Sequence, residues 1–502
     1  MGGVLGLQRE DPVSTPQVDI DTGTLRGRRE GDLIAWRGIP YAAPPVGALR
    51  LRAPQRAKSW SGVRQAVDFG FRAPQRGMSS ASEDCLTLNV LAPAQPSDTP
   101  RPVMVFVHGG AYSGGSSASS LYDGRSLARR GDIVYVSINY RLGALGYLDF
   151  TQYSTPERPF DSNLGLRDQV AALEWVRRNI AEFGGDPDNV TVFGESAGAN
   201  AVTTLMATPA AKGLFARAIA QSPPAASAYS VERAARWARE LLEIAGVSRS
   251  GAGTWLETAD PSEFVEVGTT LANRGADEEP GTRVFAPVVD GVFLPSHPLD
   301  SFASGSGHPV ALIIGTNRDE GTIFPRLHDI LPTNPTRIEK MFSHVDRAVK
   351  DRVLAAYSGY PGRQAATALG GDVSFWEPSI LCAQGHAAVA PTYSYRYDFA
   401  PRLLRVLGLG ATHATELVAV FGPAGLSARA LTLLGGRGGL ASVTDTVQSH
   451  WLHFARYGTP APGWPRYSPE RRETLIIDEV CRIESDPRGE VRRAWIGYAH
   501  QR

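Results

Sequence analysis

Cysteine is scarce in this chain. Its 502 residues contain three cysteines, Cys85, Cys382 and Cys481. Three thiols so far apart in sequence are too few for a disulfide framework or for a zinc site built from thiolates. The simplest interpretation is a soluble protein of a reducing compartment, and we expect a cytoplasmic location.

Long apolar segments and a charge imbalance are also lacking. No stretch approaches the roughly 20 apolar residues that a membrane-spanning helix needs. Residues 1–11 lack the basic start, apolar centre and small-residue cleavage site of a signal peptide. Lys and Arg together number 51, as do Asp and Glu, so the formal net charge is zero. We therefore expect neither a membrane nor a nucleic acid as a partner.

The chain does contain alternating strand-like and helix-like segments. Between Gln17 and Tyr41 the pattern predicts short antiparallel strands joined by tight turns. Further on, apolar runs alternate with helical periodicity, which predicts an α/β protein with a large, mostly parallel central sheet covered by helices on both faces. The runs predicted as strands are 103–107, 133–138, 190–193, 216–220, 310–314 and 392–399.

One helix and two insertions complete this pattern. Apolar residues recur every three or four positions from Arg167 to Phe183, and the glycines at 184–185 end the predicted helix. A six-residue linker is then expected before the strand at Val190. Two mostly helical stretches, around 230–287 and 323–385, interrupt the series of strands. We interpret them as helical cap insertions over the sheet edge, within a single domain spanning 1–502.

The strand at Val190 runs directly into Gly194-Glu195-Ser196-Ala197-Gly198. A Gly-x-Ser-x-Gly pattern alone is weak evidence, because it also arises by chance. Its position between a predicted strand and a predicted helix favours a sharp turn that exposes the hydroxyl of Ser196 as a nucleophile. The alternative is a tight turn with an ordinary serine.

A nucleophilic serine needs a base, and in this architecture the acid and then the histidine follow it in the chain. The strand at 310–314 leads to Asp319 and Glu320, either of which could be the acid. Asp290, which precedes a glycine, is typical of a turn. The candidate base is His413, in a loop shortly after the strand at 392–399.

His450 and His453 offer a different chemistry. Their i, i+3 spacing puts both on one helix face and could hold a metal ion, but no third ligand is evident in the sequence. We expect no metal site here.

A glycine-rich segment follows the strand at 103–107. It reads His-Gly-Gly-Ala-Tyr over 108–112, with Gly114 and Gly115 after it. Small residues leave backbone N–H groups free to point at a substrate, and together with the amide of Ala197 they could stabilise a negative oxygen. A flexible glycine loop is the alternative. A phosphate-binding loop is disfavoured because no Gly-Lys-Ser/Thr follows.

Longer segments resemble the type-B carboxylesterase and cholinesterase family, and its bacterial members in particular. Residues 183–198, Phe-Gly-Gly-Asp-Pro-Asp-Asn-Val-Thr-Val-Phe-Gly-Glu-Ser-Ala-Gly, resemble the family's serine signature, and Glu-Asp-Cys-Leu-Thr-Leu-Asn-Val at 83–90 resembles its second signature. Further matches lie at 37–45, 139–146 and 163–169. The resemblance covers almost the whole chain, and it implies an α/β-hydrolase fold with a Ser–Glu–His triad.

The resemblance also implies a role for individual residues. Ser196 would be the nucleophile, Glu320 rather than Asp319 the acid, and His413 the base. The backbone donors for the oxyanion would be Gly110, Ala111 and Ala197, supported by Gly109 and Glu195. The implied activity is hydrolysis of small carboxylic esters through an acyl-enzyme, without a metal or organic cofactor.

Three departures from the family pattern matter. The usual disulfide partner of Cys85 is replaced within Ala73-Pro74-Gln75, which agrees with a cytoplasmic location. The loop from Ala73 to Cys85 is short and has no tryptophan, so neither an aromatic cage for choline nor a long lipase lid is expected. Ala414 stands where a glycine is usual after the histidine, and we expect a small effect on the loop geometry.

Other functions on the same fold remain as alternatives. A lipase or a carbamate or amide hydrolase would use the same triad. A non-catalytic binding protein related to the cholinesterases would lack the serine, whereas this chain keeps all three triad residues. We expect a monomer or a weak homo-oligomer.

Overall fold

The computed structural model describes residues 16–77, 80–327, 329–422 and 429–502. Residues 1–11, which were considered for a signal peptide, lie outside the described residues. Residues 78–79, in the loop before Cys85, and residue 328, in the second predicted insertion, lie outside them too. In the described part, no helix has both the length and the apolar composition needed to cross a membrane.

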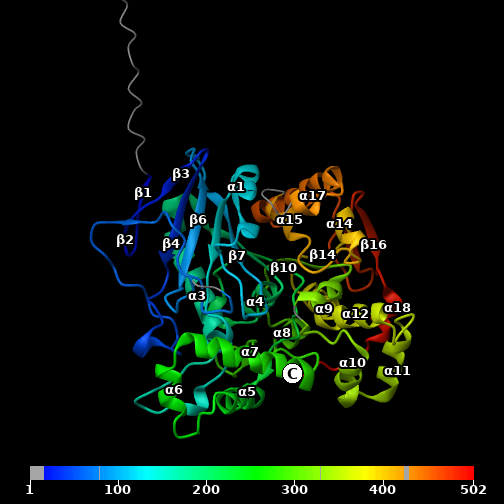
Figure 1. Cartoon of the computed structure of the whole chain (residues 1–502). Helices are drawn as coiled ribbons and strands as arrows, with labels where there is room; N and C mark the ends of the chain where they lie inside the picture. The colour runs from blue at the N-terminus through cyan, green and yellow to red at the C-terminus, as the bar shows by residue number, and fades with distance from the viewer. Residues whose placement is uncertain (1–15, 78–79, 328, 423–428) are drawn as a thin grey trace, which may run out of the picture.

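The main feature is an 11-stranded sheet (Figure 1). Neighbouring strands from β15 to β8 pair in parallel, and the strands at both edges pair antiparallel. The α/β class and the mostly parallel sheet predicted from the sequence are therefore confirmed. In spatial order the strands are β16 (Arg482–Ser485), β15 (Glu473–Ile477), β14 (Thr392–Tyr397), β13 (Ala311–Asn317), β10 (Arg217–Gln221), β9 (Gly185–Glu195), β7 (Arg101–Val107), β8 (Val134–Ile138), β6 (Thr87–Pro93), β4 (Leu33–Pro40) and β3 (Arg28–Glu30).

Helices cover both faces of this sheet, as alternate side chains of β7 illustrate. Val103 and Val105 belong to a core that contains residues of α3 (Leu164–Asn179) and α4 (Ala197–Leu205). Met104 and Phe106 belong to a second core that contains residues of α1 (Arg125–Gly131), α15 (Leu417–Phe421) and α17 (Arg437–Tyr457). Because successive side chains of a strand point to opposite faces, both faces of β7 are buried. This explains its uninterrupted apolar sequence.

All six strands predicted from apolar runs are present, with one clear error of extent. β9 begins at Gly185 and not at Val190, since Gly185 already pairs with Arg101 of β7. The linker expected before Val190 is therefore the first part of the strand. Its polar, turn-forming sequence Asp-Pro-Asp-Asn at 186–189 concealed the pairing. α3 is followed by a 3-10 turn, Ile180–Phe183, where the sequence had predicted continuous helix, and the predicted glycine stop is present at Gly184, with φ 76°.

Short strands also form near the N-terminus, as expected between Gln17 and Tyr41. β1 (Gln17–Ile20) and β2 (Gly23–Arg26) pair antiparallel, as do β3 and β4. β2 also pairs in parallel with β5 (Val63–Gln65). Two further short strands, β11 (Tyr229–Ser230) and β12 (Val288–Val289), flank the first predicted insertion.

Both predicted insertions are mostly helical in the described residues. Figure 1 shows the two helical groups at the lower end of the sheet. The grouping of these helices as caps on a single domain stays a prediction. The first stretch contains α5 (Val231–Ile244), α6 (Ala252–Thr258) and α7 (Pro261–Glu278), and the second contains α9 (Phe324–Leu327), α10 (Pro335–Met341), α11 (Arg347–Ala355), α12 (Arg363–Gly371) and α13 (Glu377–His386).

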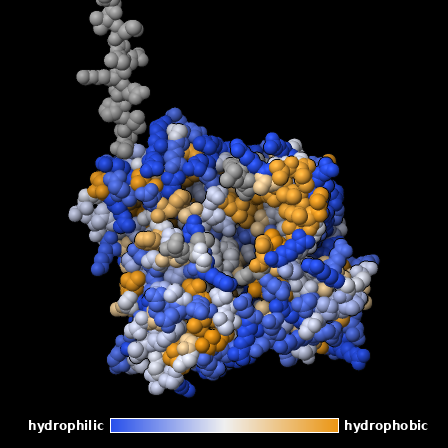
Figure 2. Space-filling view, viewed as in Figure 1, coloured by the Kyte–Doolittle hydropathy of each residue, from blue (hydrophilic) through white to orange (hydrophobic). Residues whose placement is uncertain are grey.

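Further helices are α2 (Gly143–Tyr147), α8 (Pro298–Ser304), α14 (Arg402–Val406) and α18 (Gly489–Ala494). Figure 2 shows a mostly hydrophilic face with a large apolar patch at the upper right, where Figure 1 has α14 and α17. In this part of the chain Val406, Leu407, Leu433 and Leu434 are exposed.

Candidate active site

Ser196 lies on the turn between β9 and α4, with φ 58° and ψ −123°. This is a strained conformation for a residue with a side chain. The two flanking glycines allow it. A β-carbon on Gly198 would lie 2.0 Å from the carbonyl oxygen of Val107, and one on Gly194 would lie 2.6 Å from the carbonyl carbon of Gly198. The sequence pattern thus reflects close backbone packing, and it leaves the serine side chain partly exposed.

Of the sequence-predicted site residues, Glu320 and His413 are in direct contact. Nδ1 of His413 lies 2.5 Å from Oε2 of Glu320. The carboxylate follows β13, whereas the imidazole lies in a loop between α14 and α15. The sequence placed His413 shortly after β14, and in the structure the short helix α14 intervenes.

Two neighbours that sequence reasoning missed fix the orientation of Glu320. Its Oε1 accepts hydrogen bonds from the hydroxyl of Ser222 at 2.5 Å and from the backbone N–H of Asn317 at 2.7 Å. Ser222 follows β10 and Asn317 ends β13, two parallel strands that are paired with each other. A carboxylate with three donors has its rotamer set before any substrate binds.

The other two acidic residues considered from the sequence have different roles. Oδ2 of Asp319 accepts the backbone N–H of Ala411 at 2.9 Å, so Asp319 anchors the loop that carries His413. Asp290 accepts the N–H groups of Val292, Phe293 and Leu294 at 2.8–3.0 Å, which is the turn role expected for it.

A second carboxylate lies on the other side of the imidazole. Nε2 of His413 is 3.1 Å from Oε1 of Glu195. Both atoms are buried, and neither has a hydrogen-bond partner among the described residues, Ser196 included. Nε2 of His413 is therefore available to accept a proton, although its hydrogen bond to the serine is not formed in this structure.

Three buried glutamates determine the protonation of this histidine. Burial opposes the charged imidazole, but the negative charges of Glu195 and Glu320 outweigh it and raise the pKa of His413. Burial also raises the pKa of Glu195, and the charges of Glu416 and Glu320 raise it further. Glu416, which the sequence did not single out, is held by the side-chain N–H groups of Asn317 at 2.5 Å and of Gln221 at 3.3 Å.

Two aromatic rings shield the imidazole. Phe375 stacks on His413 with centroids 4.4 Å apart and an angle of 29° between the planes, and Phe324 lies 5.2 Å away. Rings on this side exclude water and confine the histidine to the plane that its contact with Glu320 requires.

The glycine-rich segment after β7 lies directly beside the serine. A β-carbon on Gly109 would lie 2.7 Å from Oε2 of Glu195 and 3.1 Å from Cβ of Ser196. Gly110 and Ala111 have φ angles of 118° and 52°, which turn the backbone sharply at this point. The amides of Gly110, Ala111 and Ala197 have no protein acceptor among the described residues. They are free to bind a ligand oxygen.

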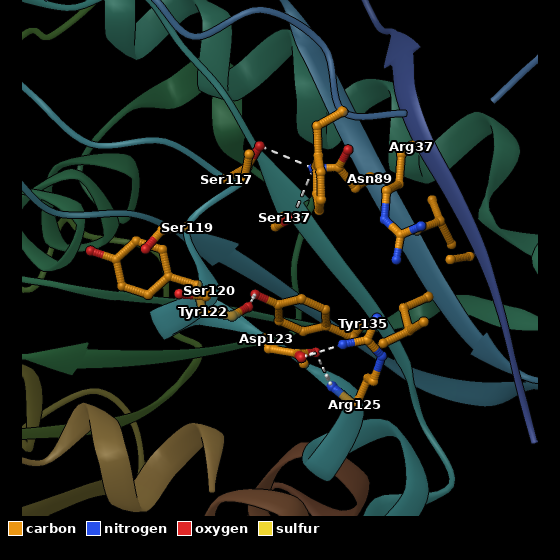
Figure 3. Close-up of a pocket in the computed structure, with 16 residues that line it drawn as sticks. Arg37, Asn89, Ser117, Ser119, Ser120, Tyr122, Asp123, Arg125, Tyr135 and Ser137 are labelled. Atoms are coloured by element: carbon orange, nitrogen blue, oxygen red, sulfur yellow. Dashed lines mark hydrogen bonds and ion pairs between the residues drawn. The ribbon is translucent and has the colours of Figure 1, made fainter. Parts of the chain in front are cut away.

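The cavity drawn in Figure 3, of about 220 Å³, is separate from this cluster. Several of its polar groups pair with one another. The side-chain N–H of Asn89 donates to Ser117 at 3.0 Å and to Ser137 at 3.1 Å, and Arg125 pairs with Asp123. Ser196, Glu320 and His413 are not among the residues that line it. We therefore place the reactive centre elsewhere.

The two histidines that the sequence offered as metal ligands, His450 and His453, make other contacts. His450 packs edge-on against Trp464 with centroids 5.1 Å apart, and Nδ1 of His453 bonds the carbonyl oxygen of Thr459 at 2.7 Å. In the described part of the chain, no group of three or more His, Cys, Asp or Glu residues has the arrangement of a metal site.

Comparison with known proteins gives consistent matches along the chain. The model of the carboxylesterase family matches residues 14–495. The chain is 37% identical to para-nitrobenzyl esterase of Bacillus subtilis, over 95% of this chain and 97% of that protein. It is 34% identical to fumonisin B1 esterase of Sphingopyxis macrogoltabida, over 94% of this chain and 87% of that protein. A solved structure of PNB esterase matches with a TM-score of 0.86 at 36% identity, covering 96% of this chain and 100% of the other.

Proposed function

The chain belongs to the carboxylesterase family and is a carboxylic ester hydrolase of the α/β-hydrolase fold, and we propose that Ser196, Glu320 and His413 are its catalytic triad. The observation that carries this proposal is the 2.5 Å contact between Nδ1 of His413 and Oε2 of Glu320. It leaves Nε2 of the same ring unpaired on the side of the serine turn.

In this proposal His413 acts as a general base. Contact with Glu320 keeps the proton on Nδ1, so the neutral imidazole presents its lone pair at Nε2. Nε2 takes the proton of Ser196 as the serine oxygen attacks the ester carbonyl. The proton then passes from Nε2 to the departing alcohol, and an acyl-enzyme remains. Water repeats the cycle and releases the acid.

The backbone amides of Gly110, Ala111 and Ala197 are the proposed oxyanion donors. They are next to Ser196 because Gly109 allows the segment after β7 to pack against it. Fixed donors stabilise the charge that develops in the transition state, and the loss of one costs roughly 10²–10³ in kcat. We propose no metal or organic cofactor for any step.

The proposed substrates are small neutral or weakly polar esters, reached from solvent without an interface. A cytoplasmic location is part of the proposal. It is supported by Cys85, Cys382 and Cys481, none of which forms a disulfide among the described residues. Cys85 is buried and free, so no other thiol of the described residues replaces its missing partner.

Hydrolysis of 4-nitrophenyl esters with acyl chains of two to twelve carbons tests the proposal. We expect turnover that is highest for short chains and that Ser196→Ala abolishes while the protein stays folded. A lipase would be favoured if activity increased with acyl chain length and appeared only above the solubility limit of the ester. Folded wild-type protein that turns over no ester would contradict the proposal.

A further inference from the structure

Arg283 differs from Arg141 and Arg488 because it has no carboxylate partner among the described residues. Buried Arg141 pairs with Asp168 at 2.6 Å, and Arg488 pairs with Asp372 at 2.5 Å. The guanidinium of Arg283, which is partly buried, has neither an ion pair nor a side-chain hydrogen bond among the described residues. A guanidinium has five N–H donors, so this one can still bind an anion.

The position of Arg283 is close to the reactive centre. Its Cζ lies 5.5 Å from the centroid of Phe375, the ring that stacks on His413 at 4.4 Å. Its backbone N–H donates to the hydroxyl of Tyr229 at 2.8 Å, which fixes the main chain at this point. One aromatic ring therefore separates the free guanidinium from the catalytic base.

Arg283 borders a cavity of about 30 Å³ beside the proposed oxyanion segment. Arg283 lines a small cavity together with Ala111, a proposed oxyanion donor. Ser113, Ala272 and Phe285 line that cavity and also a larger one of about 360 Å³, whose rim includes the exposed Arg76. The two spaces are neighbours that share these side chains. Ala111 and Arg283 thus border the same cavity.

We propose that Arg283 binds a carboxylate carried by the substrate, so that the accepted esters include ones with an anionic group near the ester bond, such as monoesters of dicarboxylic acids. This inference rests on the proposed esterase function. It adds anionic esters to the neutral esters of that proposed function.

Electrostatics supports this assignment in two ways. Desolvation lowers the pKa of Arg283, with only Tyr229 acting in the opposite direction, so a bound anion would relieve the cost of burying an unpaired charge. The three glutamates around His413 would otherwise repel an anionic substrate. The cation of Arg283, which one aromatic ring separates from His413, offsets that repulsion.

The test uses two matched pairs of substrates. Monobenzyl glutarate and benzyl pentanoate differ by a carboxylate on the acyl side, and 4-acetoxybenzoate and phenyl acetate differ by one on the alcohol side. We expect the kcat/KM of Arg283→Met to fall about 10- to 100-fold for the anionic member of one pair, with the neutral members unchanged. Whichever pair responds identifies the side of the ester that carries the carboxylate. Arg283→Lys should recover part of the loss.

Two controls keep the outcome interpretable. Arg76→Gln removes an exposed cation from the neighbouring cavity and should lower the ratio of anionic to neutral rates much less than Arg283→Met does. Free glutarate should inhibit the wild type competitively and the Arg283→Met variant much less. The inference would be overturned if Arg283→Met lowered kcat/KM equally for neutral and anionic esters. It would also be overturned if the wild type hydrolysed neutral esters but neither turned over the anionic ones nor bound glutarate. Failure on neutral esters as well would instead indicate failure of the proposed function.

Discussion

Nε2 of His413 lies 3.1 Å from Oε1 of Glu195, the residue directly before Ser196 in the chain. The same imidazole thus contacts Glu320 at Nδ1 and Glu195 near Nε2. Glu320 orients the ring. Glu195 lies beside Nε2, the atom that must accept the proton of Ser196. The basicity of His413 depends on both.

Glu195→Gln should shift the pH dependence of ester hydrolysis. His413 must be neutral to accept a proton, so activity is lost as the pH falls through its pKa. Removal of the charge of Glu195 lowers that pKa, and we expect the acidic limb of the kcat/KM profile to move to lower pH by about one unit.

The matched control is Glu174→Gln, an exposed carboxylate on α3, which should leave the profile in place. An acidic limb that Glu195→Gln does not move would mean that Glu195 carries no charge at the pH where His413 titrates. A limb that moves to higher pH would contradict the electrostatic account.

Ser222→Ala tests the support of the acid. The hydroxyl of Ser222 is one of the donors to Oε1 of Glu320, and its loss leaves the carboxylate less firmly oriented. We expect kcat to fall roughly 10-fold with little change in KM, because Ser222 positions the triad and does not touch the substrate. Ser301→Ala is the control, a buried serine on α8 whose hydroxyl pairs with Ser296. A rise in KM alone would argue against this role.

Ala414→Gly tests a departure noted from the sequence. Ala414 has φ 66°, a left-handed conformation in which its β-carbon is strained. Glycine should raise the free energy of unfolding by about 1 kcal/mol, measured by urea denaturation, with kcat unchanged. Ala419→Gly, in the right-handed helix α15, should lower it instead. Destabilisation by both substitutions would show that the backbone at 414 is not under strain.

Much of the fold could be predicted from the sequence because its signals are local. The buried parallel strands are continuous apolar runs, and the turn at Ser196 needs glycines at 194 and 198 whatever surrounds it. The strands β15 and β16 were not predicted, since β15 pairs with β14, which is far away in the chain, and β16 is an edge strand that pairs with β15. The first residues of β9 were missed for the same reason.

Some residues of the candidate site could likewise be predicted from the sequence, and others could not. Ser196, Glu320 and His413 were selected by motif, chain order and family resemblance. Ser222, Asn317 and Glu416 were not, because each acts through a contact between segments that only the packed sheet brings together. A usable signal existed for Ser222. It follows the carboxyl end of β10, which pairs with the strand that carries Ser196.

Covalent labelling tests the central claim most directly. An organophosphate that carries a reporter group is allowed to react with the folded protein, and the modified peptide is identified by mass spectrometry. The account predicts a single adduct on Ser196, with loss of esterase activity in proportion to labelling and no adduct in Ser196→Ala. An active wild-type protein in which Ser196 stays unlabelled, or whose inactivation follows an adduct on another residue, would contradict it.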